Sequence, residues 1–215
     1  MKTLFAYTSF VRILSEIALL VTLVVVLFGC LGANTTITIR DDGSGEVEID
    51  FQISKLIAHL GNESSRFPNL SLPITREEVT AAIDAIPGAS LADYLRADEA
   101  EDVVVGLRIG FDDLDTLEAL FNRLDGPDLS IVSGENGSTT FELTLYDGLE
   151  SPPDESVAEM IRAFFSDYEL IWTLKAPTDI VTASRGQVDG RTVTVEYDTD
   201  DILLSTQSVV WNLDW

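Results

Sequence analysis

An apolar run near the start of the chain constrains this sequence more than any other feature. Residues 17–28 are almost entirely apolar, and Lys2 and Arg12 precede them. A helix that crosses a bilayer needs about 20 such residues, so this run is short for a transmembrane span. A positive start followed by about 7–15 apolar residues is typical of a secretory signal peptide. The run therefore predicts that the rest of the chain folds outside the cytoplasm.

The composition supports this division into an apolar leader and an acidic remainder. The 215 residues include 13 Lys and Arg against 37 Asp and Glu, a formal net charge of −24, yet the mean hydropathy is +0.18. Such a charge argues against nucleic acid as a partner, because its binding needs basic patches. One Cys and one His exclude a disulfide framework, a thiolate zinc cluster and most His-ligated metal sites. We therefore expect no cofactor and no metal ion.

Cys30 ends the leader in a recognisable context. Leu27-Phe28-Gly29-Cys30 resembles the lipobox of bacterial lipoproteins, in which an apolar residue stands three before the Cys and a small residue directly before it. The resemblance implies diacylation of Cys30, cleavage before it, and acylation of the new amine, for example with palmitate. Two or more acyl chains hold a protein stably at a membrane. The alternative is an uncleaved signal anchor in which Cys30 is incidental.

Both alternatives leave a membrane-tethered domain outside the cytoplasm. For the favoured lipoprotein we expect a signal peptide over residues 1–29, the lipidated Cys30 with a short tether over 30–34, and a single domain over 35–215. The domain would be tethered to the cell membrane or the outer membrane on its extracytoplasmic side. An extended chain covers about 3.5 Å per residue, so the folded part would start within about 20 Å of the bilayer.

Alternating apolar and polar residues predict strands along most of the domain. Residues 46–53 alternate, with Val47 and Ile49 facing inward, and pair with residues 35–40 through the turn at 41–45. A capping box at Thr75 opens the first predicted helix. Helices are expected to begin near residues 76, 113 and 154, and strands are expected over 35–40, 46–53, 91–95, 102–111, 129–132, 139–146, 168–174, 180–183, 192–197 and 208–215.

This order of elements favours an α+β fold. Strands and helices alternate along the chain, while many strand pairs are local hairpins. We expect a largely antiparallel sheet built from hairpins, about three helices packed on one face of it, and an all-β C-terminal segment.

The sequence contains no recognisable catalytic constellation. His59 is the only histidine, and no G-x-S-x-G elbow is present, so a nucleophilic serine has no evident base. A lone His in a short apolar stretch is usually structural or simply exposed. Two acidic clusters match no EF-hand loop, and a weak calcium site is the less favoured interpretation of each. These clusters are Asp112, Asp113 and Asp115, and Glu196, Asp198, Asp200 and Asp201.

Three tryptophans are the candidate contacts for a ligand or an interface. Trp172, Trp211 and Trp215 all lie near the C-terminal end of the sequence, and Trp211 and Trp215 would share one face of a strand. They can form an aromatic platform for a sugar, an acyl chain or the membrane interface. The favoured interpretation is core packing, since large rings bury well. Trp215 is the one of that strand pair that we expect to be more exposed, because chain ends are usually less buried.

The layout of the domain resembles that of LppM-type bacterial lipoproteins. A strand and the motif Gly110-Phe111-Asp112-Asp113-Leu114 open a helix, and a later strand ends at a corner marked by Pro177. The chain closes with strands around Val193 and Trp211. Thr178 stands where the family usually has Gly. The resemblance implies an α/β domain that binds lipids or glycolipids of the cell envelope, and it transfers no catalytic residue.

We therefore expect a non-enzymatic envelope lipoprotein that binds a lipid, a glycolipid or a partner protein beside the membrane. The alternative is a carboxylate-dependent hydrolase acting on cell-envelope material, which only the abundance of acidic residues supports. A solute-binding lipoprotein is less favoured, because such proteins generally need two lobes and a longer chain.

Overall fold

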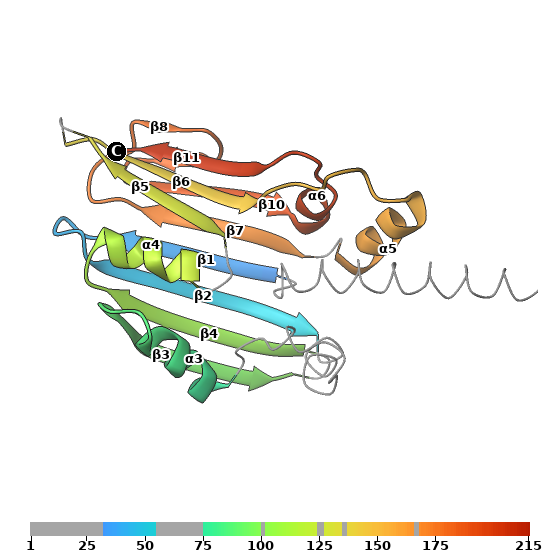
Figure 1. Ribbon diagram of the computed structural model, residues 1–215, viewed down its shortest axis with the longest axis horizontal. Helices are drawn as coiled ribbons and strands as arrows, with labels where there is room; N and C mark the ends of the chain where they lie inside the picture. Colours follow the sequence, from blue (N-terminus) through green and yellow to red (C-terminus); the bar gives the residue numbers. More distant parts are fainter. Residues whose placement is uncertain (1–31, 55–74, 100–101, 124–126, 135–136, 166–167) are drawn as a thin grey trace, which may run out of the picture.

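Two stacked β-sheets form the framework of the domain (Figure 1). The structure is a computed structural model, and it describes residues 32–54, 75–99, 102–123, 127–134, 137–165 and 168–215. Sheet A has seven strands in the order β3-β4-β2-β1-β7-β10-β9, and sheet B has four in the order β5-β6-β11-β8. The strands of sheet A are β1 (Gly32–Ile39), β2 (Gly45–Ser54), β3 (Ala89–Asp98), β4 (Asp102–Phe111), β7 (Glu169–Lys175), β9 (Gln187–Asp189) and β10 (Thr192–Asp198). The strands of sheet B are β5 (Asp128–Ser133), β6 (Thr139–Tyr146), β8 (Thr182–Ala183) and β11 (Val209–Asp214).

Sheet A is mixed, because its first strand lies at its centre. β1 pairs with β2 in an antiparallel hairpin on one side and with β7 in parallel on the other. The remaining pairs in sheet A are antiparallel. The parallel pair brings together two strands that are far apart in the sequence, so local hairpins alone do not account for this sheet.

Four helices connect the strands in the described part of the chain: α3 (Arg76–Asp84), α4 (Leu114–Arg123), α5 (Glu155–Phe165) and α6 (Thr199–Leu203). The predicted capping box of α3 is present, with Thr75 accepting from the amide of Glu78 and Glu78 accepting from the amide of Thr75. The Asp113 carboxylate caps α4 by accepting from the amide of Thr116 at 2.7 Å. Both sequence-based helix starts are thereby confirmed.

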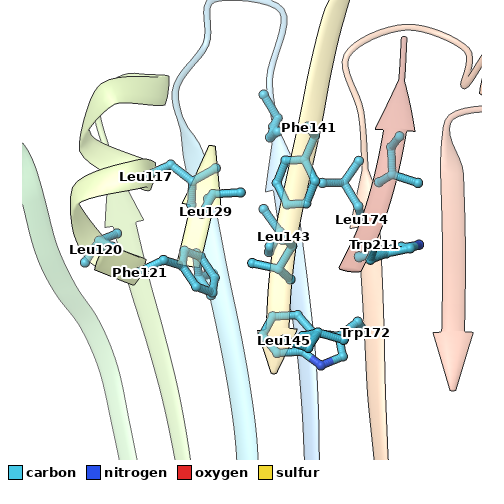
Figure 2. Close-up of a cluster of buried hydrophobic side chains, with 14 of the residues drawn as sticks. Leu117, Leu120, Phe121, Leu129, Phe141, Leu143, Leu145, Trp172, Leu174 and Trp211 are labelled. Atoms are coloured by element: carbon cyan, nitrogen blue, oxygen red, sulfur yellow. The ribbon is translucent and has the colours of Figure 1, made fainter. Parts of the chain in front are cut away.

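The core lies between the two sheets and under α3 and α4. In sheet A the inward residues follow the predicted alternation: Ile37 lies opposite Val47, Val47 lies opposite Ile109, and all three are buried. One continuous cluster of buried side chains joins this face to sheet B. Figure 2 shows Phe141 and Leu143 of β6 lying over Leu174 of β7 in that cluster.

The expected α+β arrangement is wrong. The domain is mostly β, and part of the inner face of sheet A is covered by sheet B where a layer of helices was expected. The C-terminal segment is also not all-β, because α6 separates β10 from β11. Alternation along a strand shows which side chains are buried, but a second sheet and a helix layer bury them equally well. The alternation along the strands therefore did not show whether a second sheet or a layer of helices covers sheet A.

Candidate functional site

The connections that carry α5 and α6 leave from the end where β1 begins, which we call the anchor end (Figure 1). Because β7 is parallel to β1, it also begins there, and the antiparallel β2 and β10 end there. The opposite end has the turn between β1 and β2, the turn at residues 190–191 between β9 and β10, and the start of the connection that carries α4.

Two of the anchor-end connections are bonded to each other. The amide of Leu149, after β6, donates to the carbonyl of Ser205, after α6, at 2.8 Å. The hydroxyl of Ser208 donates to the carbonyl of Tyr146 at 3.2 Å. Next to them, Val157 and Ile161 of α5 and Leu203 of α6 form a small buried cluster of their own. This part of the anchor end is therefore a packed structure held apart from the main core.

The three tryptophans are all buried in the main core. Trp172 on β7 packs against Phe121 of α4, with ring centroids 6.0 Å apart. Trp211 and Trp215 both contact Phe141, at 6.1 and 6.2 Å between centroids. Trp211 is fully buried, while Trp215 and Trp172 are 6% and 8% exposed. In this conformation their surfaces are used in packing, and a ligand contact at any of them stays a prediction.

Trp211 also forms a hydrogen bond to the loop between β8 and β9, where the chain passes from sheet B to sheet A. Its indole nitrogen donates to the carbonyl of Arg185 at 3.2 Å. Arg185 lies between β8 and β9, and its guanidinium carbon is 5.3 Å from the centroid of the Tyr197 ring. Burial raises the pKa of Tyr197, and the positive charge and the hydrogen-bonding side chain of Arg185 oppose that rise. The phenol oxygen of Tyr197 is buried.

The alternation of β10 indicates that Tyr197 faces inward, but no sequence signal links it to Arg185. Residues 193, 195 and 197 alternate with polar residues, and all three are buried. Arg185 follows a strand of only two residues. So short a strand has no sequence pattern that predicts where the chain turns from one sheet to the other. The contact between these two side chains was therefore not predicted.

Three carboxylates lie together on the outer face of sheet A at the anchor end. Glu169 of β7 lies directly opposite Asp198 of β10, with Glu196 on the same face. The charge of Glu196 is the main cause that raises the pKa of Glu169, with a smaller effect from Asp198. Glu169 is fully exposed. Among the described residues, no group of three or more Asp, Glu, His or Cys is arranged to hold a metal ion.

The other residues singled out from the sequence fall into two groups. Cys30 and His59 lie outside the described residues. Asp113 of the first acidic cluster is the cap of α4, and its hydrogen bonds to Thr116 lower its pKa. None of the helices in the described part of the chain is both long enough and apolar enough to span a membrane.

Comparison with solved structures finds a similarity to the folded domain of LppM from Mycobacterium tuberculosis, whose structure was determined by NMR. The similarity covers 85% of this chain and 86% of that chain, with a TM-score of 0.45 and 12% sequence identity. No protein-family model matches the chain, and no curated protein matches it.

Proposed function

We propose that this chain is a membrane-anchored extracytoplasmic lipoprotein whose domain is non-enzymatic and binds a lipid, a glycolipid or an envelope partner close to the membrane. One observation carries the proposal: β1 begins at Gly32, two residues after the lipobox Cys30. Two residues span at most about 7 Å. An acylated Cys30 would therefore hold the anchor end of the sandwich against the bilayer surface.

The placement of the connections supports a binding role at that end. Connections between strands are where binding residues are most often found, because a rigid framework positions them. Here the segments after β6 and β10, which carry α5 and α6, leave from the anchor end. A tether this short would keep them beside lipid head groups, whereas a long tether would let the domain turn away.

The hydrolase alternative has one observation in its favour, the raised pKa of Glu169 beside Glu196. A glycosidase uses such a pair of carboxylates across a bound sugar. Both residues project from the outer face of an open sheet, where water has free access. A Glu169→Gln variant that lost a measured envelope-hydrolase activity would favour this alternative.

Lipid labelling tests the anchor. Cells expressing the full chain would be grown with an alkyne-tagged fatty acid, next to cells expressing Cys30→Ser, and the purified chains would be probed for the tag. We expect the tag in the native chain alone, together with release of the Cys30→Ser chain from the membrane fraction or retention of its leader. Equal labelling of both chains would contradict the anchor at Cys30.

Native mass spectrometry tests the ligand. The full lipidated chain would be purified in a neutral detergent from its own host, and the spectrum would be searched for bound envelope lipids. The control is residues 1–34 fused to an unrelated soluble domain, which carries the same anchor and reports lipids bound only to it. We expect a lipid bound to the native chain and absent from the control. Lipid-free protein that takes up none of the host's lipids would refute lipid binding.

A further inference from the structure

The asparagines of this chain are distributed unevenly with respect to Ser and Thr. The chain has six Asn, and four of them stand in the pattern Asn-x-Ser/Thr, in which x is not Pro. Ser and Thr make up 36 of the 215 residues, so chance placement gives about one such pattern among six Asn. The pattern, called a sequon, is the acceptor sequence for N-linked glycans in proteins outside the cytoplasm. The sequons begin at Asn34, Asn62, Asn69 and Asn136.

The two Asn outside the sequons both have a place inside the fold. The side-chain nitrogen of Asn122 on α4 donates to the carbonyl of Leu129 at 3.0 Å, and its side-chain oxygen accepts from the amide of Leu129 at 2.8 Å. Asn122 thereby joins α4 to the edge strand β5. The side-chain oxygen of Asn212 on β11 is buried. A glycan on either amide would therefore disrupt the structure around it.

Asn34 is the sequon asparagine that lies within the described residues, and it stands on the outer face of sheet A. Thr35 and Ile37 of β1 are buried, so the alternation of β1 directs Asn34 and Thr36 to the other face. Asn34 is exposed, and its register partner Asp50 on β2 is exposed as well. The Asn34 side chain forms no hydrogen bond with another described residue. A bulky group on this amide would project into solvent and leave the core contacts intact.

The position of Asn34 also suits a sugar donor that is held in the membrane. Asn34 follows Cys30 by four residues, which span at most about 14 Å. An anchor at Cys30 would therefore keep the Asn34 amide close to the bilayer surface. N-linked glycans are transferred from donors attached to membrane lipids, and holding an acceptor near its donor favours the transfer.

We propose that Asn34 is N-glycosylated from a lipid-linked oligosaccharide phosphate. The side-chain nitrogen of Asn34 forms a bond to C1 of the first sugar, and the bond between C1 and the phosphate oxygen breaks. The lipid phosphate leaves with that electron pair, and the amide gives up one proton. This chain is the acceptor, and a transferase of the host membrane is the catalyst. The proposal rests on the proposed function, because it requires the domain to lie outside the cytoplasm.

Mass spectrometry of the full chain from its own host tests the site. Cells would be grown with the alkyne-tagged fatty acid, and the chain would be purified in a neutral detergent and digested with trypsin and chymotrypsin. Cleavage after Leu31 and Arg40 releases residues 32–40, which contain Asn34 and not the acylated Cys30. The mass of this peptide and its fragmentation by electron transfer locate any added sugar. The tag on Cys30 is measured in the same sample.

Four variants separate the sequon from its surroundings. Asn34→Gln removes the acceptor but keeps an amide, Thr36→Ala removes the hydroxyl of the sequon, and Thr36→Ser keeps a hydroxyl there. Thr38→Ala is the matched control, because Thr38 lies on the same face of the same strand and outside the sequon. We expect sugar on Asn34 in the native chain, in Thr36→Ser and in Thr38→Ala. We expect its complete loss in Asn34→Gln and Thr36→Ala.

Three results would overturn the site. The first is a native chain that carries the tag on Cys30 and yields residues 32–40 only without sugar, which leaves the proposed function intact. An untagged chain that stays in the cytoplasm without sugar would instead contradict both. The second is sugar that remains on this peptide in Asn34→Gln, because it would be attached to a neighbouring threonine. The third is a loss of sugar in Thr38→Ala as complete as in Thr36→Ala.

Discussion

On the outer face of sheet B, the Asp214 carboxylate accepts hydrogen bonds from threonines on the two neighbouring strands. The hydroxyl of Thr182 on β8 lies 2.6 Å from one oxygen, and that of Thr140 on β6 lies 2.7 Å from the other. These two bonds, Thr182 first, lower the pKa of Asp214. One side chain thus joins three strands, including β8, which has only two residues in the ladder.

We expect Asp214→Asn to lower the free energy of unfolding by about 1 kcal/mol at pH 7, near the low end for bonds to a charged group because the site is partly exposed. The folded-state pKa of Asp214 lies below its unfolded value. Its contribution is therefore present above about pH 4 and is lost as the pH falls through the folded-state pKa.

Urea unfolding across the pH range measures this difference. Glu142→Gln is the control, because Glu142 lies on the same outer face and the substitution also removes one negative charge. A deficit of Asp214→Asn that persists unchanged down to pH 2 would show that the bonded charge is not its cause.

For single residues, the sequence predicted which side chains are buried better than it predicted which residues contact each other. Core packing was the favoured interpretation of Trp211, and Trp211 is fully buried. The sequence did not predict that the Arg185 carbonyl would accept from Trp211, or that its guanidinium would lie over Tyr197. Those contacts depend on how the chain turns between two sheets, and a two-residue strand followed by a loop carries no periodic signal of that turn.

At the scale of elements, Gly88 joins α3, β3 and the start of α4. Its φ is +84°, which L side chains rarely adopt, and its carbonyl accepts from the amide of Asp112 at 3.1 Å. A Cβ at this position would lie 2.6 Å from the hydroxyl oxygen of Thr116, which is buried. Both the backbone angle and the space therefore favour glycine here.

We expect Gly88→Ala to destabilise the domain by about 2–4 kcal/mol, through the left-handed backbone and the clash together. Gly137→Ala is the matched control, because Gly137 also has a positive φ, +78°, but a Cβ there meets nothing within 4 Å. Its expected cost is about 1 kcal/mol, from the backbone alone. Urea unfolding followed by tryptophan fluorescence measures both, and equal losses would rule out the clash with Thr116.

Most elements were predictable, but the way they assemble was not. The hairpin of β1 and β2, strand β4 and the starts of α3 and α4 follow the sequence signals closely. β9 and α6 were missed, because three and five residues are too short to show a period. The second sheet was missed because Phe141 and Trp211 alternate just as residues under a helix layer would. The parallel pairing of β1 with β7 joins segments that are far apart in the sequence, and no local sequence pattern predicts it.

At the scale of the whole molecule, charge would decide how a domain anchored at Cys30 sits beside a bilayer. A chain with a formal net charge of −24 that is held close to anionic head groups is repelled by them. The carboxylates of Glu169, Glu196 and Asp198 lie at the anchor end itself, where the repulsion is strongest. Salt screens such repulsion over about 10 Å at 0.1 M and over less at higher concentration.

We expect the lipidated chain to stand off an anionic supported bilayer at low salt and to approach it as salt rises. Neutron reflectivity measures the gap between the protein layer and the head groups. On a zwitterionic bilayer, the control, the gap should change little with salt. Tight association with the anionic bilayer at low salt would contradict this expectation.

Under the proposed function, the central position of β1 would also set an order of events during export. β1 begins two residues after Cys30, yet its parallel neighbour β7 belongs to the last third of the chain. Pairing between such distant segments forms late, since the intervening chain must first emerge. A peptidase that cuts before Cys30 would therefore meet a first strand that still lacks one neighbour, and processing would precede completion of the sheet.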